Sequence, residues 1–328
     1  MALNFRRYLR LLPFFKKLDD ERTRRLAELE NERARLQAEL LRLKANQDEW
    51  TRFVPPGHFC SPIPSRAEIA EAFARGDLGP PFPAVDLNEA GQFARLERFA
   101  SYYPDQPFPE IQVPGRRFYL DNPSYGHHDA IMLYCMLREA QPRRVIEVGS
   151  GFSSAAMLDV GELVLGKKVE FTFIDPDMSR LRTLLRADDH TRCTLIEKRV
   201  QEVPIDRFAA LAENDVLFID SSHVSKIGSD VNRLYFNVLP ALAPGVLIHI
   251  HDIAWNLEYP LEWLEEGRAW NEQYLLRAFL MNNSTYRIEL FSAWLGRMKH
   301  EFMSARMPMC ARGGGGQIWL RKLEKKGG

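Results

Sequence analysis

The sequence predicts an α/β protein whose sheet is mostly parallel and ends in an antiparallel strand. From residue 141 onwards, short runs of β-branched and aromatic residues alternate with amphipathic runs of helical length. This alternation is typical of parallel strands that are covered by helices on both faces. Near the C-terminus the pattern changes to two strand-like runs separated by a long excursion, which indicates the antiparallel end of the sheet.

The individual elements follow from hydrophobic periodicity. Strands are expected at 144–148, 170–174, 194–198, 216–219, 246–250, 286–292 and 317–323. Helices are expected near 153–165, 178–187, 205–212 and 226–239. The run Gly313–Gly316 lacks the Lys-Ser/Thr of a phosphate-binding loop, so we interpret it as a flexible connector.

The N-terminal part divides into two regions before this domain, which we place at 141–328. Residues 1–50 combine a basic segment with a helix in which leucines recur at heptad spacing, namely Leu26, Leu29, Leu36, Leu40 and Leu43. Leucine at these positions favours a two-stranded coiled coil and therefore a homo-oligomer. Packing of this helix against the rest of the chain is the alternative. Residues 51–140 are dense in proline and aromatic residues, which indicates an irregular cap or lid.

Composition narrows the class of protein. Hydrophobic residues make up 45% and charged residues 27% of the chain, and the formal net charge is zero, so no whole-chain field would attract nucleic acid. The four cysteines are far apart, which fits a reducing compartment and a cytoplasmic protein. We expect no transmembrane segment. The basic amphipathic N-terminus can rest on a membrane surface, so peripheral membrane contact stays open.

A glycine-rich turn follows the first predicted strand. In Val145-Ile-Glu-Val-Gly-Ser-Gly-Phe-Ser-Ser154 a buried strand runs into the turn and then into a helix. Glycine is needed where the backbone approaches a ligand closely or takes a positive φ. Ser153 or Ser154 can cap the helix. Nicotinamide-binding folds use a similar turn, but here Ser154 stands in place of their third glycine.

An acidic residue ends the second predicted strand. Asp175 follows Phe173 and Ile174, where a carboxylate can accept hydrogen bonds from both hydroxyls of a ribose. An ordinary turn residue in Asp-Pro-Asp is the alternative. The sequence therefore predicts a nucleoside-containing ligand at the carboxyl ends of the strands.

Several motifs together carry a resemblance to a known family. They are Val145–Ser154, Phe218-Ile-Asp-Ser-Ser-His223, Gly228-Ser-Asp-Val-Asn232, Pro244-Gly-Val-Leu-Ile-His-Ile-His-Asp252 and Gly267-Arg-Ala-Trp-Asn-Glu272. From about Tyr119 to Leu323 the chain resembles stand-alone bacterial class I methyltransferases of the type-24 methyltransferase-domain family. The resemblance implies a Rossmann-like fold and S-adenosylmethionine as cofactor, but it does not define the methyl acceptor.

The resemblance also implies roles for particular residues. Glu147, two positions before the first glycine, would hold the methionine end of the cofactor. The turn residues would line the same site, namely Gly149, Ser150, Gly151, Ser153 and Ser154. Gln201 and Glu202 stand where the family contacts adenine. Tyr125 and Asp129 lie in a segment that often closes over the cofactor in this fold, with a surface turn as the alternative.

Two further strand ends carry polar side chains. Asp220 ends the strand at 216–219, with His223 three residues on, and His251-Asp252 follows the strand at 246–250. Because ligands bind outside the carboxyl ends of parallel strands, both ends should face one crevice. The arrangement resembles the metal site of cation-dependent O-methyltransferases, which implies Asp220, His251 and Asp252 as ligands. His251 departs from that pattern, and imidazole suits Fe, Mn or Zn better than Mg.

Other interpretations stay open at this point. Without a metal, His223 or His251 could act as a general base near neutral pH, and a structural role for both is the remaining alternative. The leading hypothesis is O-methylation of a small-molecule or glycan hydroxyl. N- or C-methylation, a nicotinamide-dependent oxidoreductase and a non-catalytic scaffold are the competing hypotheses. Trp255, Tyr259, Trp263 and Trp270 follow the strand at 246–250 and could form an aromatic wall for the acceptor.

Overall fold

The computed structural model describes residues 2–50, 53–76 and 78–324, with side chains described over 16–44, 53–76 and 78–324. It divides into two compact units, Met1–Ala70 and Glu71–Gly328. Within the described residues, no helix is both long and apolar enough to cross a membrane.

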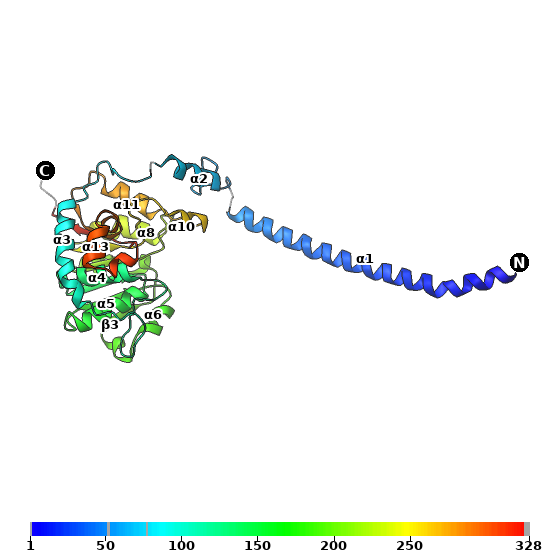
Figure 1. The fold of residues 1–328 in the computed structure, drawn as a ribbon, viewed down its shortest axis with the longest axis horizontal. Helices are drawn as coiled ribbons and strands as arrows, with labels where there is room; N and C mark the ends of the chain where they lie inside the picture. Colours follow the sequence, from blue (N-terminus) through cyan, green and yellow to red (C-terminus); the bar gives the residue numbers. More distant parts are fainter. Residues whose placement is uncertain (1, 51–52, 77, 325–328) are drawn as a thin grey trace. The chain divides into compact units, whose positions relative to one another are not determined.

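The elements occur in the following order and are labelled as in Figure 1. The helices are α1 (Ala2–Trp50), α2 (Arg66–Arg75), α3 (Glu89–Tyr102), α4 (His127–Ala140), α5 (Phe152–Leu163), α6 (Ser179–Leu184), α7 (Ile205–Ala209), α8 (Asp230–Arg233), α9 (Leu239–Ala241), α10 (Leu261–Glu265), α11 (Glu272–Leu280), α12 (Ser292–Met298) and α13 (His300–Arg306). The strands are β1 (Arg144–Val148), β2 (Glu170–Ile174), β3 (Cys193–Ile196), β4 (Val216–Ile219), β5 (Leu247–Ile250), β6 (Tyr286–Phe291) and β7 (Ile318–Lys322). Short 3-10 turns are η1 (Tyr103–Asp105), η2 (Ala187–Thr191), η3 (Val200–Glu202) and η5 (Cys310–Arg312), and η4 (Leu234–Val238) is a π-helical turn.

The seven strands form one sheet in the order β3-β2-β1-β4-β5-β7-β6. The five strands from β3 to β5 run parallel, while β7 pairs antiparallel with both β5 and β6. This confirms the predicted fold class, including its antiparallel end. Strand order reverses between β1 and β4, so their carboxyl ends open a crevice of the kind in which ligands bind.

The sheet is covered on both faces. Every residue of β4 and of β5 is buried, and successive side chains of a strand point to opposite faces, so helices or loops must pack on each side. One hydrophobic core includes these strands together with side chains from α3, α4 and α5, such as Phe99, Leu133 and Met157. The core therefore fixes the strand ends at which the polar residues of the site stand.

A buried ionic cluster anchors the segment before α4. The Arg117 guanidinium donates to Asp189 at 2.7 Å, to Asp159 at 2.8 Å and to Glu162 at 3.0 Å. These acids lie in or next to α5 and η2. Burial opposes the charge of Arg117, but the three carboxylates outweigh it and raise its pKa. The chain around Arg117 is thereby held against the domain that contains the sheet.

The first unit contains α1, one continuous helix over the whole predicted coiled-coil segment. The leucines of the heptad pattern expose between 50% and 59% of their surface. Leu41, which lies outside the pattern, is exposed at 65%. The helix is confirmed, whereas the coiled coil and the homo-oligomer stay predictions.

Candidate active site

The turn between β1 and α5 requires glycine at its first position. Gly149 has φ +87°, and a Cβ there would lie 1.7 Å from the carbonyl oxygen of Asp220. The backbones that follow β1 and β4 therefore approach each other more closely than any side chain would allow. Gly151 is the N-cap of α5, and a Cβ there would meet only the Arg180 side chain, at 3.3 Å.

Glu147 lies fully buried behind this turn. Its carboxylate accepts hydrogen bonds from the Ser153 hydroxyl at 2.5 Å and from the Ser154 hydroxyl. The Ser154 hydroxyl in turn accepts from the Gly151 amide at 3.0 Å, so it ties the turn to the helix. Burial raises the pKa of Glu147 to about 8, even though the two serine hydroxyls favour its charged form.

A first cavity of about 510 Å³ opens beside the turn, between the ends of β1, β2 and β4. Gly149, Asp175, Gln201 and Asp220 line it. Asp175 accepts from the Ser150 amide at 2.7 Å, which shapes the glycine-rich turn. Of the predicted adenine-contacting pair, Gln201 faces this cavity, whereas the Glu202 carboxylate accepts from the Arg199 amide at 3.1 Å.

Three side chains from two neighbouring strand ends meet at the edge of this cavity. The Nε2 atom of His223 lies 3.4 Å from Asp220 Oδ1 and 3.3 Å from Asp252 Oδ2. One donor atom from each of the three residues lies within 4.8 Å of the others. We call Asp220, His223 and Asp252 the Asp-His-Asp cluster. His223 and Asp252 have positive φ values of 60° and 57°, a strained conformation that clusters at functional sites.

His223 is held from behind by a residue to which the sequence analysis gave no role. Glu272, the first residue of α11, is buried, and its Oε2 lies 2.9 Å from His223 Nδ1. The backbone amides of Asn271 and Glu272 both donate to the His223 carbonyl oxygen. The Trp270 ring packs on the imidazole, with ring centroids 4.4 Å apart. The only sequence signal was that Glu272 closes the last motif of the family resemblance.

His251 stands next to the cluster and contacts a different set of partners. Its Nδ1 lies 3.3 Å from Asp252 Oδ1 and 3.7 Å from Asp220 Oδ1, and its Nε2 lies 3.7 Å from Asp129 Oδ2. Asp129 also accepts from the Gly316 amide at 2.9 Å. The buried Tyr125 ring packs against His251, with centroids 5.3 Å apart. Tyr125 and Asp129, which were predicted to contact the cofactor, are thus brought together with His251.

Neighbouring carboxylates determine the protonation of both histidines. Burial alone would lower the pKa of His223, but Asp220, Asp252 and Glu272 outweigh it and raise the pKa to about 11. Burial likewise opposes charge on His251, while Asp220, Asp129 and Asp252 raise its pKa well above the ordinary value. Burial disfavours charge on Asp252, yet the two imidazoles hold its pKa well below the usual range. His249, one layer deeper, stacks on Phe218, and burial lowers its pKa.

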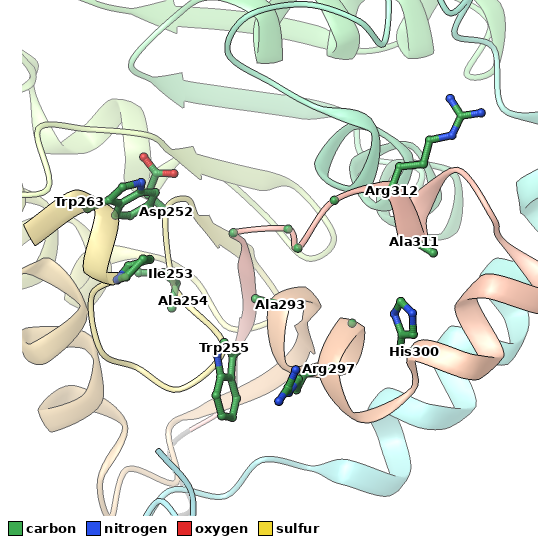
Figure 2. Close-up of a pocket in the computed structure, with 16 residues that line it drawn as sticks. Asp252, Ile253, Ala254, Trp255, Trp263, Ala293, Arg297, His300, Ala311 and Arg312 are labelled. Carbon is green, nitrogen blue, oxygen red and sulfur yellow. The ribbon is translucent and has the colours of Figure 1, made fainter. Parts of the chain in front are cut away.

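A second cavity, of about 650 Å³, opens beside Asp252 of the cluster (Figure 2). Asp252 lines it, and so do Trp255 and Trp263 of the predicted aromatic wall. Tyr259 and Trp270 instead pack against Trp263. All four glycines of the run Gly313–Gly316 line this cavity, and the amide of Gly316 donates to Asp129. Whether the run is a flexible connector stays a prediction.

The strand order, the glycine turn after β1 and the acid after β2 define a Rossmann-like class I methyltransferase domain. The match to known proteins agrees with this class. Residues 146–253 match the family model described as a methyltransferase domain. An uncharacterized protein of Archaeoglobus fulgidus is 31% identical over 186 residues, which cover 53% of this chain and 81% of that protein. The chain belongs to the class I S-adenosylmethionine-dependent methyltransferases, which excludes the nicotinamide-dependent oxidoreductase.

CmcI and TomG are among the solved structures to which this chain is similar. A CmcI structure with Mg and SAM is 20% identical, with a TM-score of 0.39, and the match covers 65% of this chain and 77% of that one. The O-methyltransferase TomG of Streptomyces achromogenes, involved in tomaymycin synthesis and in complex with SAM, is 14% identical with a TM-score of 0.38. That match covers 78% of this chain and 96% of TomG.

Proposed function

We propose that this methyltransferase methylates a hydroxyl oxygen of a small molecule or glycan, at a divalent-cation site in the Asp-His-Asp cluster. The observation that carries the proposal is the position of the cluster between two cavities. Asp220 lines the first cavity and Asp252 lines the second, while their carboxylates both lie within 3.4 Å of His223. A methyl donor in the first cavity and an acceptor in the second would meet beside these side chains.

The first cavity suits S-adenosylmethionine. Asp175 and Gln201 both line this cavity, where Asp175 would accept from the ribose hydroxyls and Gln201 would contact the adenine. Glu147 supports the turn from its buried position and would face the charged methionine end. The turn keeps its shape because Ser150 donates to Asp175, Ser153 and Ser154 donate to Glu147, and Gly151 donates to the Ser154 hydroxyl.

The donor atoms of the cluster fit a divalent cation. Atoms bound to one ion at about 2.1 Å lie roughly 3 Å from each other, close to the separations around His223 Nε2. The hydrogen bond from His223 Nδ1 to Glu272 leaves Nε2 free for a ligand role, as in carboxylate–histidine–metal triads. Two carboxylates with an imidazole suit Mn, Fe or Zn better than Mg. His251 is a second nitrogen donor at this edge. The ligand set predicted from the sequence, Asp220, His251 and Asp252, is therefore the alternative to the cluster with His223.

The charge of the site supports the cation over a metal-free histidine base. Without a cation, the carboxylates around His223 raise its pKa to about 11, so the imidazole keeps its proton at neutral pH and cannot accept one from the acceptor. A cation at Nε2 would have to displace the same proton, so metal affinity should fall as the pH is lowered. Asp129, Asp220, Asp252 and Glu272 surround the two imidazoles with carboxylates. A divalent ion would balance this charge with both histidines neutral.

The protein's own residues then have separate tasks. Asp220 and Asp252 provide hard oxygen ligands, and Glu272 orients His223 toward them. Asp129 holds His251 beside the same edge, where its imidazole can accept the acceptor proton once it is neutral. A bound divalent ion supplies Lewis acidity that lowers the pKa of a coordinated hydroxyl. Trp255 and Trp263 line the second cavity, where their half-buried side chains would cover part of the acceptor.

The test combines metal content with product analysis. Protein treated with chelator is titrated with Mn²⁺, Zn²⁺, Fe²⁺ and Mg²⁺, and Asp220→Asn should abolish tight binding while S-adenosylhomocysteine still binds. Asp230→Asn is the matched control, because Asp230 lines the first cavity outside the cluster. S-adenosylmethionine with a ¹³C-labelled methyl group then shows by NMR whether the label enters an O-methyl or an N-methyl group. Full turnover by metal-free protein, or label on nitrogen, would overturn the proposal.

A further inference from the structure

We propose that the second cavity binds an acceptor that combines a ring with an anionic group, and that Arg297 recognises the anion. This rests on the proposed function, because Asp252 of the Asp-His-Asp cluster lines the same cavity. The reacting hydroxyl would lie at the Asp252 end, the ring against tryptophan, and the anion toward α12 and α13. A carboxylate and a phosphate share this chemistry.

The charges that line the cavity are distributed unevenly. Asp252 is the only acid among the described residues that line it, whereas Arg297, His300 and Arg312 also line it. Figure 2 shows Asp252 and Trp263 at one end and His300 and Arg312 at the other. The glycine run Gly313–Gly316 connects the two ends. It starts directly after Arg312, and at its other end a Cβ on Gly316 would lie 3.6 Å from the Asp252 Cα. One end of the cavity is therefore acidic and the other basic.

The two arginines differ in how their charge is balanced. Arg312 lies 2.6 Å from Glu110, and its side chain points away from Arg297 in Figure 2. Arg297 stacks its guanidinium over the Trp255 ring at 5.5 Å, and no carboxylate of the described part of the chain lies within ion-pair distance of it. An arginine that is held on an aromatic face, and whose donors have no acidic partner, is prepared for a planar anion. Arg297 is thus the cation left for a ligand.

Tryptophan side chains provide the surface for the ring. Trp255 and Trp263 both line the cavity and are half-buried, so part of each indole stays accessible. Indole faces bind sugar rings and aromatic rings through dispersion and stacking. Trp255 carries Arg297 on its ring, which places the ring-binding surface next to the anion-binding group. A neutral acceptor would leave Arg297 unused.

The glycine run keeps the opposite wall thin. Gly315 has φ +64°, and a Cβ there would lie 2.4 Å from Cδ2 of the buried His128 ring. The amide of Ile253 donates to the Gly316 carbonyl at 2.8 Å, so the wall is also fixed to the chain after Asp252. Gly314, in contrast, has no atom within 4 Å of an added Cβ. A side chain at position 314 would therefore occupy open space beside the cavity without disturbing its frame.

The experiment measures binding of matched probes to the full chain with S-adenosylhomocysteine present. Quenching of tryptophan fluorescence measures the affinity of each probe. The affinity of 3,4-dihydroxybenzoate is compared with that of its methyl ester, and the affinity of galacturonate with that of methyl galactoside. Galactose 6-phosphate is compared with galacturonate and with methyl galactoside. The anionic member of a pair should bind about tenfold tighter, which is about 1.4 kcal/mol. The carboxylate and phosphate arms show which anion the cavity prefers.

Substitutions then locate the preference. Arg297→Gln should remove the difference within each pair, and Arg297→Lys should restore part of it. Arg306→Gln is the matched control, because Arg306 is an exposed arginine that also lies over an aromatic ring, Phe302, and does not line the cavity. Gly314→Leu should weaken binding of every probe while S-adenosylhomocysteine affinity stays unchanged. All three positions are exposed, so folding should be preserved, and thermal melts verify this.

The outcomes separate this inference from the proposed function. Equal binding of neutral and anionic probes, or an anion preference that survives Arg297→Gln, would overturn the inference. A preference for anionic probes that depends on Arg297 supports the inference. It does so even if Asp220→Asn leaves the metal content unchanged, a result that would reject the cation site. Loss of metal in Asp220→Asn with no anion preference in the wild type rejects the inference alone.

Discussion

Glu147 offers a test in which stability and function should change in opposite directions. Its buried carboxyl has a pKa of about 8, against 4.5 for an ordinary glutamate. Between these values the folded protein keeps a proton that the unfolded chain releases. The stability contributed by the neutral carboxyl is therefore fully present below pH 4.5 and is lost as the pH rises through 8. Glu147→Gln removes the titrating group and with it this loss.

The size of the effect follows from the two pKa values. Each unit of difference corresponds to about 1.36 kcal/mol, so the wild type should lose about 4 kcal/mol between pH 5 and pH 9 through this one group. The glutamine also disturbs the hydrogen bonds from Ser153 and Ser154, which costs about 1–2 kcal/mol at every pH. The difference between the two proteins across pH isolates the titration, because the constant cost and the titrating groups that do not interact with Glu147 cancel.

Urea unfolding of both proteins from pH 5 to pH 9 measures this difference, and the glutamine variant should gain on the wild type as the pH rises. Calorimetry should at the same time show weaker binding of S-adenosylhomocysteine to the variant, since the positive methionine end favours an ionised Glu147. For the same reason, wild-type affinity should increase with pH through 8. A stability difference that is independent of pH would show that Glu147 is ionised in the folded protein, and unchanged affinity would remove it from the cofactor site.

Three further predictions follow from the geometry. Gly149→Ala should destabilise the fold by at least about 2 kcal/mol and abolish S-adenosylhomocysteine binding, because its Cβ would overlap the Asp220 carbonyl. Gly151→Ala should fold normally. Thermal melts and calorimetry check both variants. Light scattering should detect an oligomer of the wild type, and Leu36→Asp should dissociate it. Leu41→Asp, outside the heptad pattern, should leave the oligomer intact. A wild-type monomer at micromolar concentration would contradict the coiled coil. Glu272→Gln should weaken metal affinity about 10- to 100-fold without altering S-adenosylhomocysteine affinity, and equal metal titrations of variant and wild type would reduce Glu272 to a packing role.

Strand positions could be predicted because burial on both faces leaves a strong sequence signal. The bounds of β1, β2 and β4 agree with the expected ranges 144–148, 170–174 and 216–219. Helix bounds were less accurate. The helix expected from 226 begins only with α8 at Asp230, because Ser229 caps it by accepting from the Asn232 amide. Apolar periodicity marks a buried face, but it does not tell where a polar side chain ends the preceding loop.

The polar residues at the strand ends were predictable for a topological reason. The carboxyl ends of neighbouring parallel strands lie at one edge of a sheet, so Asp220 and Asp252 had to be close once the strands were known. Glu272 and Arg297 have no such signal. Each stands on a helix far along the chain from its partner, and only tertiary packing brings Glu272 to His223 and Arg297 to Trp255.

Strand alternation alone does not decide whether His223 or His251 is the metal ligand. His249 and His251 lie on one face of β5 by simple alternation, and that face meets α4 residues, so His251 is directed toward Asp129 as well as toward the cluster. His223 follows β4 in a loop, where alternation predicts nothing. Its backbone is left-handed, the amides of Asn271 and Glu272 hold its carbonyl oxygen, and its Nε2 lies within 3.4 Å of both Asp220 and Asp252. Glu272 occupies Nδ1 of His223, so only Nε2 is free to bind a ligand. The same contact fixes the orientation of the ring, as the carboxylate partners of metal-binding histidines do. His251→Ala should therefore retain more of the metal affinity than His223→Ala, and the reverse order in a metal titration would return the ligand role to His251.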